Sequence, residues 1–292
     1  MAGEAPGGAT SGYGYGHGGG ELGAAVSVEQ VARESASLLQ RGVPRERLAE
    51  LAGGDDYLRI DGLEAGYGRM QIVHGIDLQV GRGQSLCLIG PNGAGKSTVL
   101  HAIYGLNTIT GGTIHKDGRD ITRMHSADKL RQAGIAYILQ DNSVFPDMTV
   151  EENLQMGAFL MRDKAAVRAA VAGVLERYPR LAERRAQPAR VLSGGERRLL
   201  EISRALVMDP DVLLVDEPSI GLEPRYIDMV FEILVDLRDR ERKTIVMVEQ
   251  NARKGLQFAD LGYVLVAGNL ALAGSGAELL DDPRVGRLFL GG

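Results

Sequence analysis

Residues 90–98 have the residue types and the spacing that bind phosphate groups, in the pattern Gly-x-x-x-x-Gly-Lys-Ser that ends on Lys96 and Ser97. An apolar run at 86–89 precedes them and a largely apolar segment at 99–103 follows, which predicts a strand, a glycine-rich loop and a helix. The backbone N–H groups of such a loop, and those at the start of the helix, point toward a di- or triphosphate. We expect Lys96 to bridge the β- and γ-phosphates and the Ser97 hydroxyl to bind Mg²⁺.

Two acidic residues, Asp216 and Glu217, follow the apolar run 212–215. An α/β sheet holds its ligands at the carboxyl ends of its strands, so this strand end is expected to face the bound nucleotide. Asp216 is placed to fix the Mg²⁺ shell. Glu217, one residue further along, points in another direction and can polarise the attacking water as a general base.

A second combination of a hydroxyl and two glycines occurs at Ser193, Gly194 and Gly195, before a long helix predicted at 197–208. Unpaired N–H groups at the N-terminus of a helix attract anions. A chain with one phosphate loop has little use for a second phosphate cradle of its own. We therefore predict that this segment serves a nucleotide held by another subunit.

Composition limits the class of protein. The 292 residues are 44% apolar, which is enough to form a packed core. The net charge of -5 argues against nucleic-acid binding, because nucleic-acid-binding proteins are usually basic. The one cysteine, Cys87, excludes an intrachain disulfide framework and fits a reducing cytosol. No stretch reaches the ~20 apolar residues of a membrane-spanning helix, and the first residues lack the pattern of a secretory signal.

The first 54 residues differ from the rest of the chain. Residues 1–25 are dominated by glycine and alanine, and such a segment is expected to be disordered. Residues 27–30 form a capping-box pattern that opens a helix ending at Gly42, and Pro44 suits the first turn of a second short helix. These amphipathic helices could dock on a partner, fold back on the main domain or form a weakly helical linker.

From residue 55 onward the pattern predicts a compact α/β domain. The alternating segments 57–65 and 72–80 indicate antiparallel strands, and glycines 111 and 112 indicate a turn before a short strand. Further strands are expected at 86–89, 135–139, 212–215, 244–248, 263–266 and 270–273. Residues 149–185 have helical periodicity without a strand signal, and other helices are expected at 97–104, 225–241 and near 277–280.

The phosphate loop, the Leu-Ser-Gly-Gly-Glu segment at 192–196 and the Asp-Glu strand end occur in the order and spacing of ATP-binding cassette (ABC) transporter ATPases. The chain resembles this family from about residue 57 to residue 292. The resemblance implies an α/β P-loop NTPase fold for residues 55–292, with a mixed, largely parallel core sheet, an antiparallel β-subdomain and an inserted α-helical subdomain at about 142–208. It also implies a head-to-tail pair of subunits that encloses two ATP molecules with Mg²⁺.

The resemblance implies roles for further residues. Tyr67 would stack on adenine, and Gln140 would contact Mg²⁺ and the attacking water at the start of a loop that couples to membrane subunits. Gln250 stands where most cassette ATPases have a histidine, and its amide can donate a hydrogen bond but cannot carry charge. The candidate catalytic residues are Gln140, Glu217 and Gln250, and the candidate Mg²⁺ ligands are Ser97, Gln140 and Asp216. The candidate nucleotide-binding residues are Tyr67, Gly90, Pro91, Asn92, Gly93, Ala94, Gly95, Lys96, Ser97, Thr98, Ser193, Gly194, Gly195 and Glu196.

Four segments narrow the subfamily. Residues 148–154, 218–222, 248–252 and 290–292 resemble importers of branched-chain amino acids, most closely the shorter of that system's two ATPase subunits; relatives with this pattern serve urea and short-chain amides. The run at 196–198, Glu-Arg-Arg, instead resembles the ATPase of lipopolysaccharide exporters.

The sequence therefore predicts an ATP-hydrolysing subunit that lies peripherally on the cytoplasmic face of the cell membrane and powers import of branched-chain amino acids or related solutes. Its expected partners are a second ATPase subunit (another copy or a sister), membrane-spanning permease subunits and, indirectly, a solute-binding protein, with no nucleic acid. The alternatives are the ATPase of a lipid or lipopolysaccharide exporter and a soluble ABC ATPase that acts outside transport.

Overall fold

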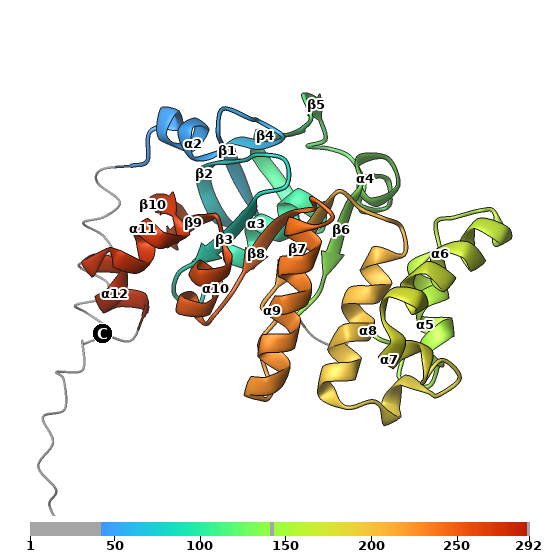
Figure 1. The fold of residues 1–292 in the computed structure, drawn as a ribbon. Helices are drawn as coiled ribbons and strands as arrows, with labels where there is room; N and C mark the ends of the chain where they lie inside the picture. The colour runs from blue at the N-terminus through green and yellow to red at the C-terminus, as the bar shows by residue number, and fades with distance from the viewer. Residues whose placement is uncertain (1–41, 141–142, 291–292) are drawn as a thin grey trace, which may run out of the picture.

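The computed structural model describes residues 42–140 and 143–290, and its strands form two sheets (Figure 1). An antiparallel sheet has the strand order β2-β1-β4-β5, and a six-stranded sheet has the order β10-β9-β3-β8-β7-β6. The strands are β1 (Leu58–Tyr67), β2 (Met70–Val80), β3 (Ser85–Ile89), β4 (Thr108–Lys116), β5 (Arg119–Asp120), β6 (Ile135–Ile138), β7 (Val212–Asp216), β8 (Thr244–Val248), β9 (Leu261–Val266) and β10 (Asn269–Ser275). The helices are α2 (Arg45–Leu51), α3 (Lys96–Tyr104), α4 (Ser126–Ala133), α5 (Val150–Gly157), α6 (Lys164–Arg177), α7 (Pro179–Ala182), α8 (Gly194–Leu206), α9 (Pro224–Asp239), α10 (Ala252–Phe258), α11 (Gly276–Asp281) and α12 (Pro283–Phe289).

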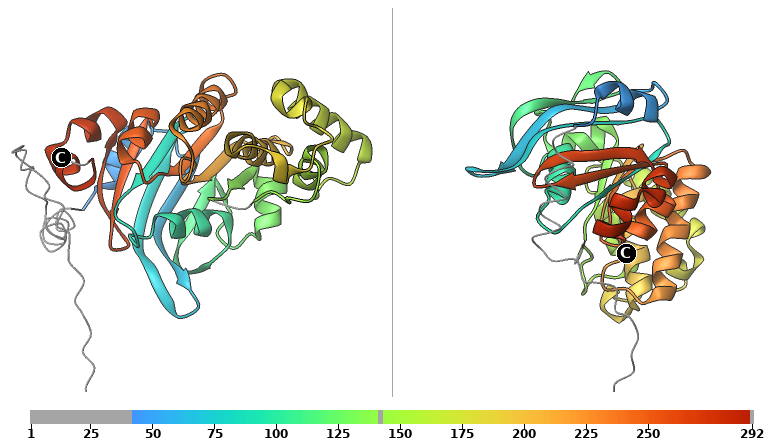
Figure 2. Two further views of the ribbon diagram at one scale, coloured as in Figure 1. Left: turned by 90° about the horizontal axis from the view of Figure 1, so that it is seen from below. Right: turned by 90° about the vertical axis from the view of Figure 1, so that its left-hand side faces the viewer.

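The six-stranded sheet is the core, and it is mixed as predicted: all of its neighbouring strands pair in parallel except β10, which runs antiparallel to β9. Every residue of β3, β7 and β8 is buried, because both faces of the sheet are covered. One face packs with α3 and the antiparallel sheet, and the other packs with α9 and α10. Figure 2 shows the antiparallel sheet and α9 on opposite sides of this core.

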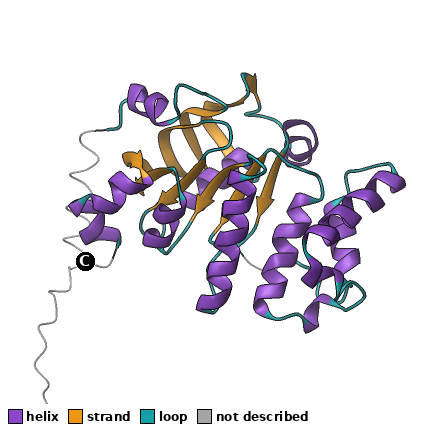
Figure 3. Ribbon diagram, viewed as in Figure 1, coloured by secondary structure: helices purple, strands orange, loops and turns teal. Residues whose placement is uncertain are grey.

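The predicted α-helical subdomain is confirmed. Helices α5 to α8 surround a hydrophobic cluster of their own, and Figure 3 shows helices without strands in this part of the molecule. Helix α8 joins the helical subdomain to the core sheet. Leu200 lies in the hydrophobic cluster of the subdomain, whereas Ile202 lies in the cluster of the core sheet. Among residues 42–140 and 143–290, none of the helices combines the length and apolar character needed to cross a membrane.

The turn predicted at glycines 111 and 112 is wrong, because both residues lie inside β4. The pairing of β4 with β1 shifts register between Asp61 and Glu64, and Gly112 has a φ of 78° there. A Cβ on Gly112 would lie 2.4 Å from the carbonyl oxygen of Gly62. The glycines therefore permit a bulge and close contact between strands, which is a second common use of glycine in sheets.

Helix α2 folds back on the body of the protein. Leu48 is 2% exposed in the cluster between the two sheets. Arg45 donates to Asp77 on β2 at 2.8 Å, and Arg47 pairs with Glu278 on α11 at 2.7 Å. Of the three alternatives for this helix, the structure thus selects packing on the main domain. The helix predicted to begin at residue 27 and the glycine-rich segment before it lie outside the described residues.

A buried lysine joins α4 to the end of α3. Lys129 is fully buried, and its Nζ donates to the carbonyl oxygens of Ala102 and Ile103 at 3.2 and 2.7 Å. Burial lowers the pKa of Lys129 to about 8, below the ~10.4 of a solvated lysine. Lys129 therefore loses its proton at a lower pH in the folded protein than in the unfolded chain.

We expect Lys129→Met to lower the free energy of unfolding by about 1–3 kcal/mol, because a buried carbonyl of α3 loses its donor. The deficit should grow from about pH 7 to about pH 9.5, because the folded wild-type protein releases the Lys129 proton in this range while the unfolded chain still holds it. The stability of the wild type then rises with pH through this group, whereas that of the variant does not. Urea denaturation of both proteins at the two pH values measures this, and an unchanged difference would contradict it.

Candidate nucleotide site

The glycine-rich loop between β3 and α3 brings backbone close to backbone. Gly90 has a φ of 148°, and a Cβ there would lie 2.2 Å from the carbonyl oxygen of Leu265. Gly95, with a φ of 95°, is the N-cap of α3 and offers no side chain to its first N–H groups. These N–H groups are left for an anion, and the positive end of the helix dipole points the same way.

Lys96 lies across this loop. Its side chain is buried, and Nζ donates to the carbonyl oxygens of Gly90 and Pro91 at 3.0 and 3.1 Å. Burial lowers the pKa of Lys96, while the carboxylates of Glu217 and Asp216 oppose that shift. The ammonium is thus held over the loop in a position to contact phosphate oxygens.

Ser97 and Asp216 meet at the carboxyl end of β7. The Ser97 hydroxyl donates to Oδ1 of Asp216 at 3.0 Å, and the Tyr137 hydroxyl donates to Oδ2 at 2.7 Å. Hydroxyl and carboxylate oxygens are the ligands that Mg²⁺ prefers, alongside water and phosphate. No cluster of three or more His, Cys, Asp or Glu side chains able to hold a metal occurs in the described part of the chain.

Tyr137, on β6, is a site residue that the sequence reasoning missed. Burial raises the pKa of its hydroxyl, and Asp216 adds to that shift, so the hydroxyl stays protonated and donates to the carboxylate. The only signal in the sequence was a phenol within an otherwise apolar strand, and that signal does not say which residue it reaches.

Glu217 follows β7 and makes contacts different from those of Asp216. It has a φ of 41°, in the left-handed region that favours glycine, and its N–H donates to the carbonyl of Val248 at 2.9 Å. The amide Nε2 of Gln140 donates to its Oε2 at 3.0 Å. The structure therefore brings together a carboxylate and an amide that are 77 residues apart in the chain.

A cavity of about 500 Å³ opens in front of these groups. Tyr67 lies at its edge with 46% of its surface exposed, and its hydroxyl forms a hydrogen bond with Nδ1 of His101. The cavity is lined by Tyr67, Ile72, Asn92, Gly93, Gly95, Lys96, Ser97, Thr98, Gln140, Glu217, Ile220 and Gln250. Ten of these twelve are candidates from the sequence, and the other two are Ile72 and Ile220. Gly90, Pro91, Ala94 and Asp216 support the cavity without lining it.

The segment at Ser193–Glu196 lies apart from this cavity. The Ser193 hydroxyl accepts from the N–H of Glu196 at 3.3 Å, and Oε2 of Glu196 accepts from the N–H of Ser193 at 2.9 Å. Arg184 holds the other oxygen of Glu196 at 2.7 Å. Ser193 and Gly194 are exposed, whereas Gly195 packs against Tyr226 so closely that a Cβ would lie 2.1 Å from the ring.

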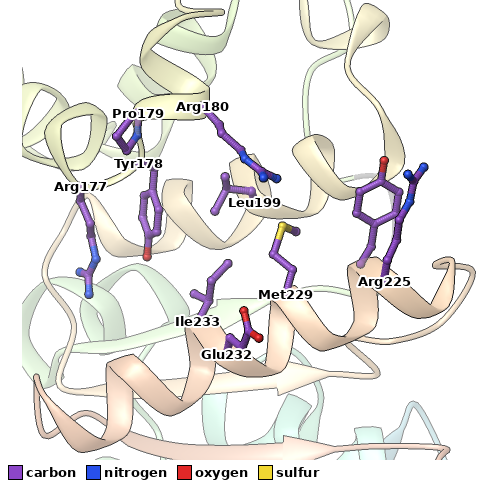
Figure 4. Close-up of a pocket in the computed structure, with 10 residues that line it drawn as sticks. Arg177, Tyr178, Pro179, Arg180, Leu199, Arg225, Met229, Glu232 and Ile233 are labelled. Carbon is purple, nitrogen blue, oxygen red and sulfur yellow. The ribbon is translucent and has the colours of Figure 1, made fainter.

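A second cavity, of about 580 Å³, lies between α9 and the helical subdomain (Figure 4). It contains none of the candidate residues. Arg177 forms an ion pair with Glu241, and Arg225 pairs with Glu223 at 3.1 Å while its guanidinium lies over the ring of Tyr226. Two of the three arginines that line this cavity thus have protein partners, and the phosphate loop does not border it, so its size alone does not make it a second nucleotide site.

The comparisons with known proteins point to one family. The family model described as ABC transporter matches residues 73–220. The chain is 42% identical over 235 residues to the high-affinity branched-chain amino acid transport ATP-binding protein BraG of Pseudomonas aeruginosa, covering 80% of this chain and 100% of that protein. It is 38% identical to the probable branched-chain amino acid transport ATP-binding protein LivF of Archaeoglobus fulgidus, covering 80% of this chain and 98% of that protein. A lipopolysaccharide export system ATP-binding protein, LptB of Haemophilus influenzae, is 32% identical, covering 80% and 97%.

Solved structures give the same result. A nucleotide-free ATP-binding cassette from an ABC transporter superposes with a TM-score of 0.71 at 27% identity, covering 81% of this chain and 99% of that one. An ATP-binding cassette in its ADP conformation gives a TM-score of 0.72 at 27% identity, with the same coverage. The fold and the site define a nucleotide-binding P-loop ATPase. The chain belongs to the ABC transporter family, as one of its ATP-hydrolysing ATP-binding subunits.

Proposed function

We propose that this ATPase binds ATP in the cavity in front of the loop, with residues 55–292 as the ATPase domain. Lys96 and the N–H groups at the start of α3 bind the β- and γ-phosphates, and Tyr67 stacks on adenine from the edge of the cavity. Ser97, Asp216 and Gln140 hold Mg²⁺, which when bound neutralises charge on the phosphates. Tyr137 keeps Asp216 oriented.

Glu217 is the general base in this proposal. Its contact with Gln140 is the observation that carries the assignment, because an amide at 3.0 Å fixes the carboxylate beside the place where a water would attack. Gln250 also lines the cavity and offers an uncharged hydrogen-bond donor to the γ-phosphate.

The segment at Ser193–Glu196 serves a nucleotide on a second ATPase subunit. Two observations support this: Ser193 and Gly194 are exposed, and neither lines the cavity of its own chain. The carboxylate of Glu196 is occupied by the cap and by Arg184, so it acts by fixing the start of α8 rather than by touching phosphate. The second subunit, another copy or a sister chain, would thus complete each catalytic cavity in a head-to-tail pair.

The partners in the membrane dock on the helical subdomain. Exposed apolar side chains occur in this subdomain, with Phe145 at 42%, Met156 at 37% and Phe159 at 77% exposure. Exposed patches of this kind mark surfaces that bind other proteins. The chain accordingly lies peripherally on the cytoplasmic face of the membrane, attached to permease subunits and acting indirectly with a solute-binding protein.

The transported solute is a branched-chain amino acid or a related compound. The identities of 42% to BraG and 38% to LivF support this more strongly than the lower identity of 32% to LptB, over a similar length, supports export of lipopolysaccharide. The run Glu-Arg-Arg at 196–198 favours the exporter. These residues lie at the start of α8, however, and do not contact solute.

The test is recovery of the partners through an affinity tag on the full-length chain. We expect two many-spanning permease subunits and a sister ATPase, together with uptake of labelled leucine that depends on this chain. Phe159→Ser should lose the permeases and keep ATP binding, whereas Leu106→Ser, 48% exposed away from the helical subdomain, should keep both. Recovery of lipid-exporting membrane proteins would refute the importer.

A further inference from the structure

A buried carboxylate joins two segments that border the nucleotide cavity. Glu249 is 1% exposed, and its Oε1 accepts from the Ser219 hydroxyl at 2.7 Å and from the N–H of Asn251 at 2.8 Å. Its Oε2 is buried without a hydrogen-bond partner in the structure of the described residues. Burying a carboxylate is costly, so a side chain in this state requires a reason.

The position of this contact in the sheet suggests the reason. The parallel pairing of β7 with β8 ends at Asp216 and Val248, and the N–H of Glu217 makes one further bond to Val248. Beyond it, within the described residues, the hydrogen bonds of 218–222 and of 250–252 to main-chain groups are local to each segment. The hydrogen bond between Glu249 and Ser219 therefore links the segments that follow β7 and β8 at a point where their backbones no longer bond to each other.

Helix α10 holds Glu249 from the other side. A Cβ on Gly255 would lie 3.1 Å from Cβ of Glu249 and 2.6 Å from Sγ of Cys87. Because Gly255 has no side chain, the helix can pack directly against these two residues. The side chain of Asn251 accepts from the N–H of Lys254 at 3.1 Å and caps this helix. Gln250 thus stands between two anchored residues.

We propose that Glu249 is a positioning residue that holds the segment after Glu217 and the backbone of Gln250 at a fixed separation in the wall of the cavity. Glu217 and Gln250 both line that cavity, and Ile220, one residue after Ser219, lines it as well. The uncharged amide of Gln250 is attracted to phosphate less strongly than a cation would be. Its hydrogen bond to phosphate therefore depends on a backbone that already holds the side chain in the right position. This inference rests on the roles proposed above for Glu217 and Gln250.

The test compares variants of the full-length chain in a steady-state ATPase assay. Ser219→Ala removes one hydrogen bond at a partly exposed position, and we expect kcat to fall about tenfold with KM for ATP changed less than about twofold. Glu249→Gln keeps an oxygen in the accepting position and should retain most of kcat, whereas Glu249→Ala should lose more than Ser219→Ala. Ser275→Ala, which removes the cap of α11, is the control: it should lower the unfolding temperature and leave kcat unchanged.

The outcomes separate this inference from the proposed function. Parental kcat in Ser219→Ala overturns the inference, and so does a loss in which kcat falls only in proportion to the folded fraction. If Glu217→Gln is inactive while Ser219→Ala is normal, the general base stands and only the positioning role is wrong. If Glu217→Gln itself retains the parental rate, the assignment of the base fails.

Discussion

Replacing Glu217 by Gln is expected to lower the rate of ATP hydrolysis by roughly 10²- to 10⁴-fold while leaving ATP binding intact. The amide has nearly the same shape as the carboxylate and can still contact Gln140, but it cannot take a proton from water. Phosphate release measures the rate. Because ATP is bound but not consumed, size-exclusion chromatography with ATP should show the paired form accumulating.

The control for this experiment is Glu176→Gln on α6, an exposed glutamate far from the cavity that makes the same chemical change. It should hydrolyse ATP at the parental rate. Hydrolysis by Glu217→Gln at the rate of this control would show that another group activates the water.

Replacing Lys96 by Ala should weaken ATP binding by about a hundredfold or more, because contacts of a cation with two phosphates are lost at once. The side chain is buried and bonded to the carbonyls of Gly90 and Pro91, so no neighbouring cation can take its place without rearranging the loop. Titration calorimetry with ATP and Mg²⁺ measures the dissociation constant.

Lys164→Ala, at an exposed position of α6, is the matched control and should bind ATP as the parent does. The two site variants then differ in kind: Lys96→Ala loses binding, whereas Glu217→Gln binds and does not turn over. Unchanged affinity in Lys96→Ala would place the phosphates elsewhere.

The features that could be predicted from the sequence are those determined by residues close together in the chain. The glycine pattern before Lys96 predicts a loop followed by a helix, because the residues that bind phosphate are contiguous. The strand before Asp216 is recognisable because burial on both faces demands an unbroken apolar run. The hydroxyl and glycines at 193–195 predict a helix start in this region, but α8 begins at Gly194, three residues before the start predicted at 197, because Ser193 and Glu196 form a capping box that includes the two glycines in the first turn.

Glycines were harder to interpret, because one residue type serves several purposes. The pair at 111 and 112 reads as a turn, yet it forms a bulge inside β4 where another strand approaches. The distinction depends on what lies opposite the glycine in the sheet, and the neighbouring residues along the chain do not contain that information.

The sequence by itself determined the chemical groups of the site and the class of fold. Only the tertiary structure decided which groups meet: Tyr137 with Asp216, Gln140 with Glu217, and Ser219 with Glu249, at separations of 79, 77 and 30 residues. These contacts follow from the strand order β3-β8-β7-β6, which sets the ends of distant strands side by side. Hydrophobic periodicity specifies that a strand is buried but not which strand lies next to it, so the partners appear only when the sheet assembles.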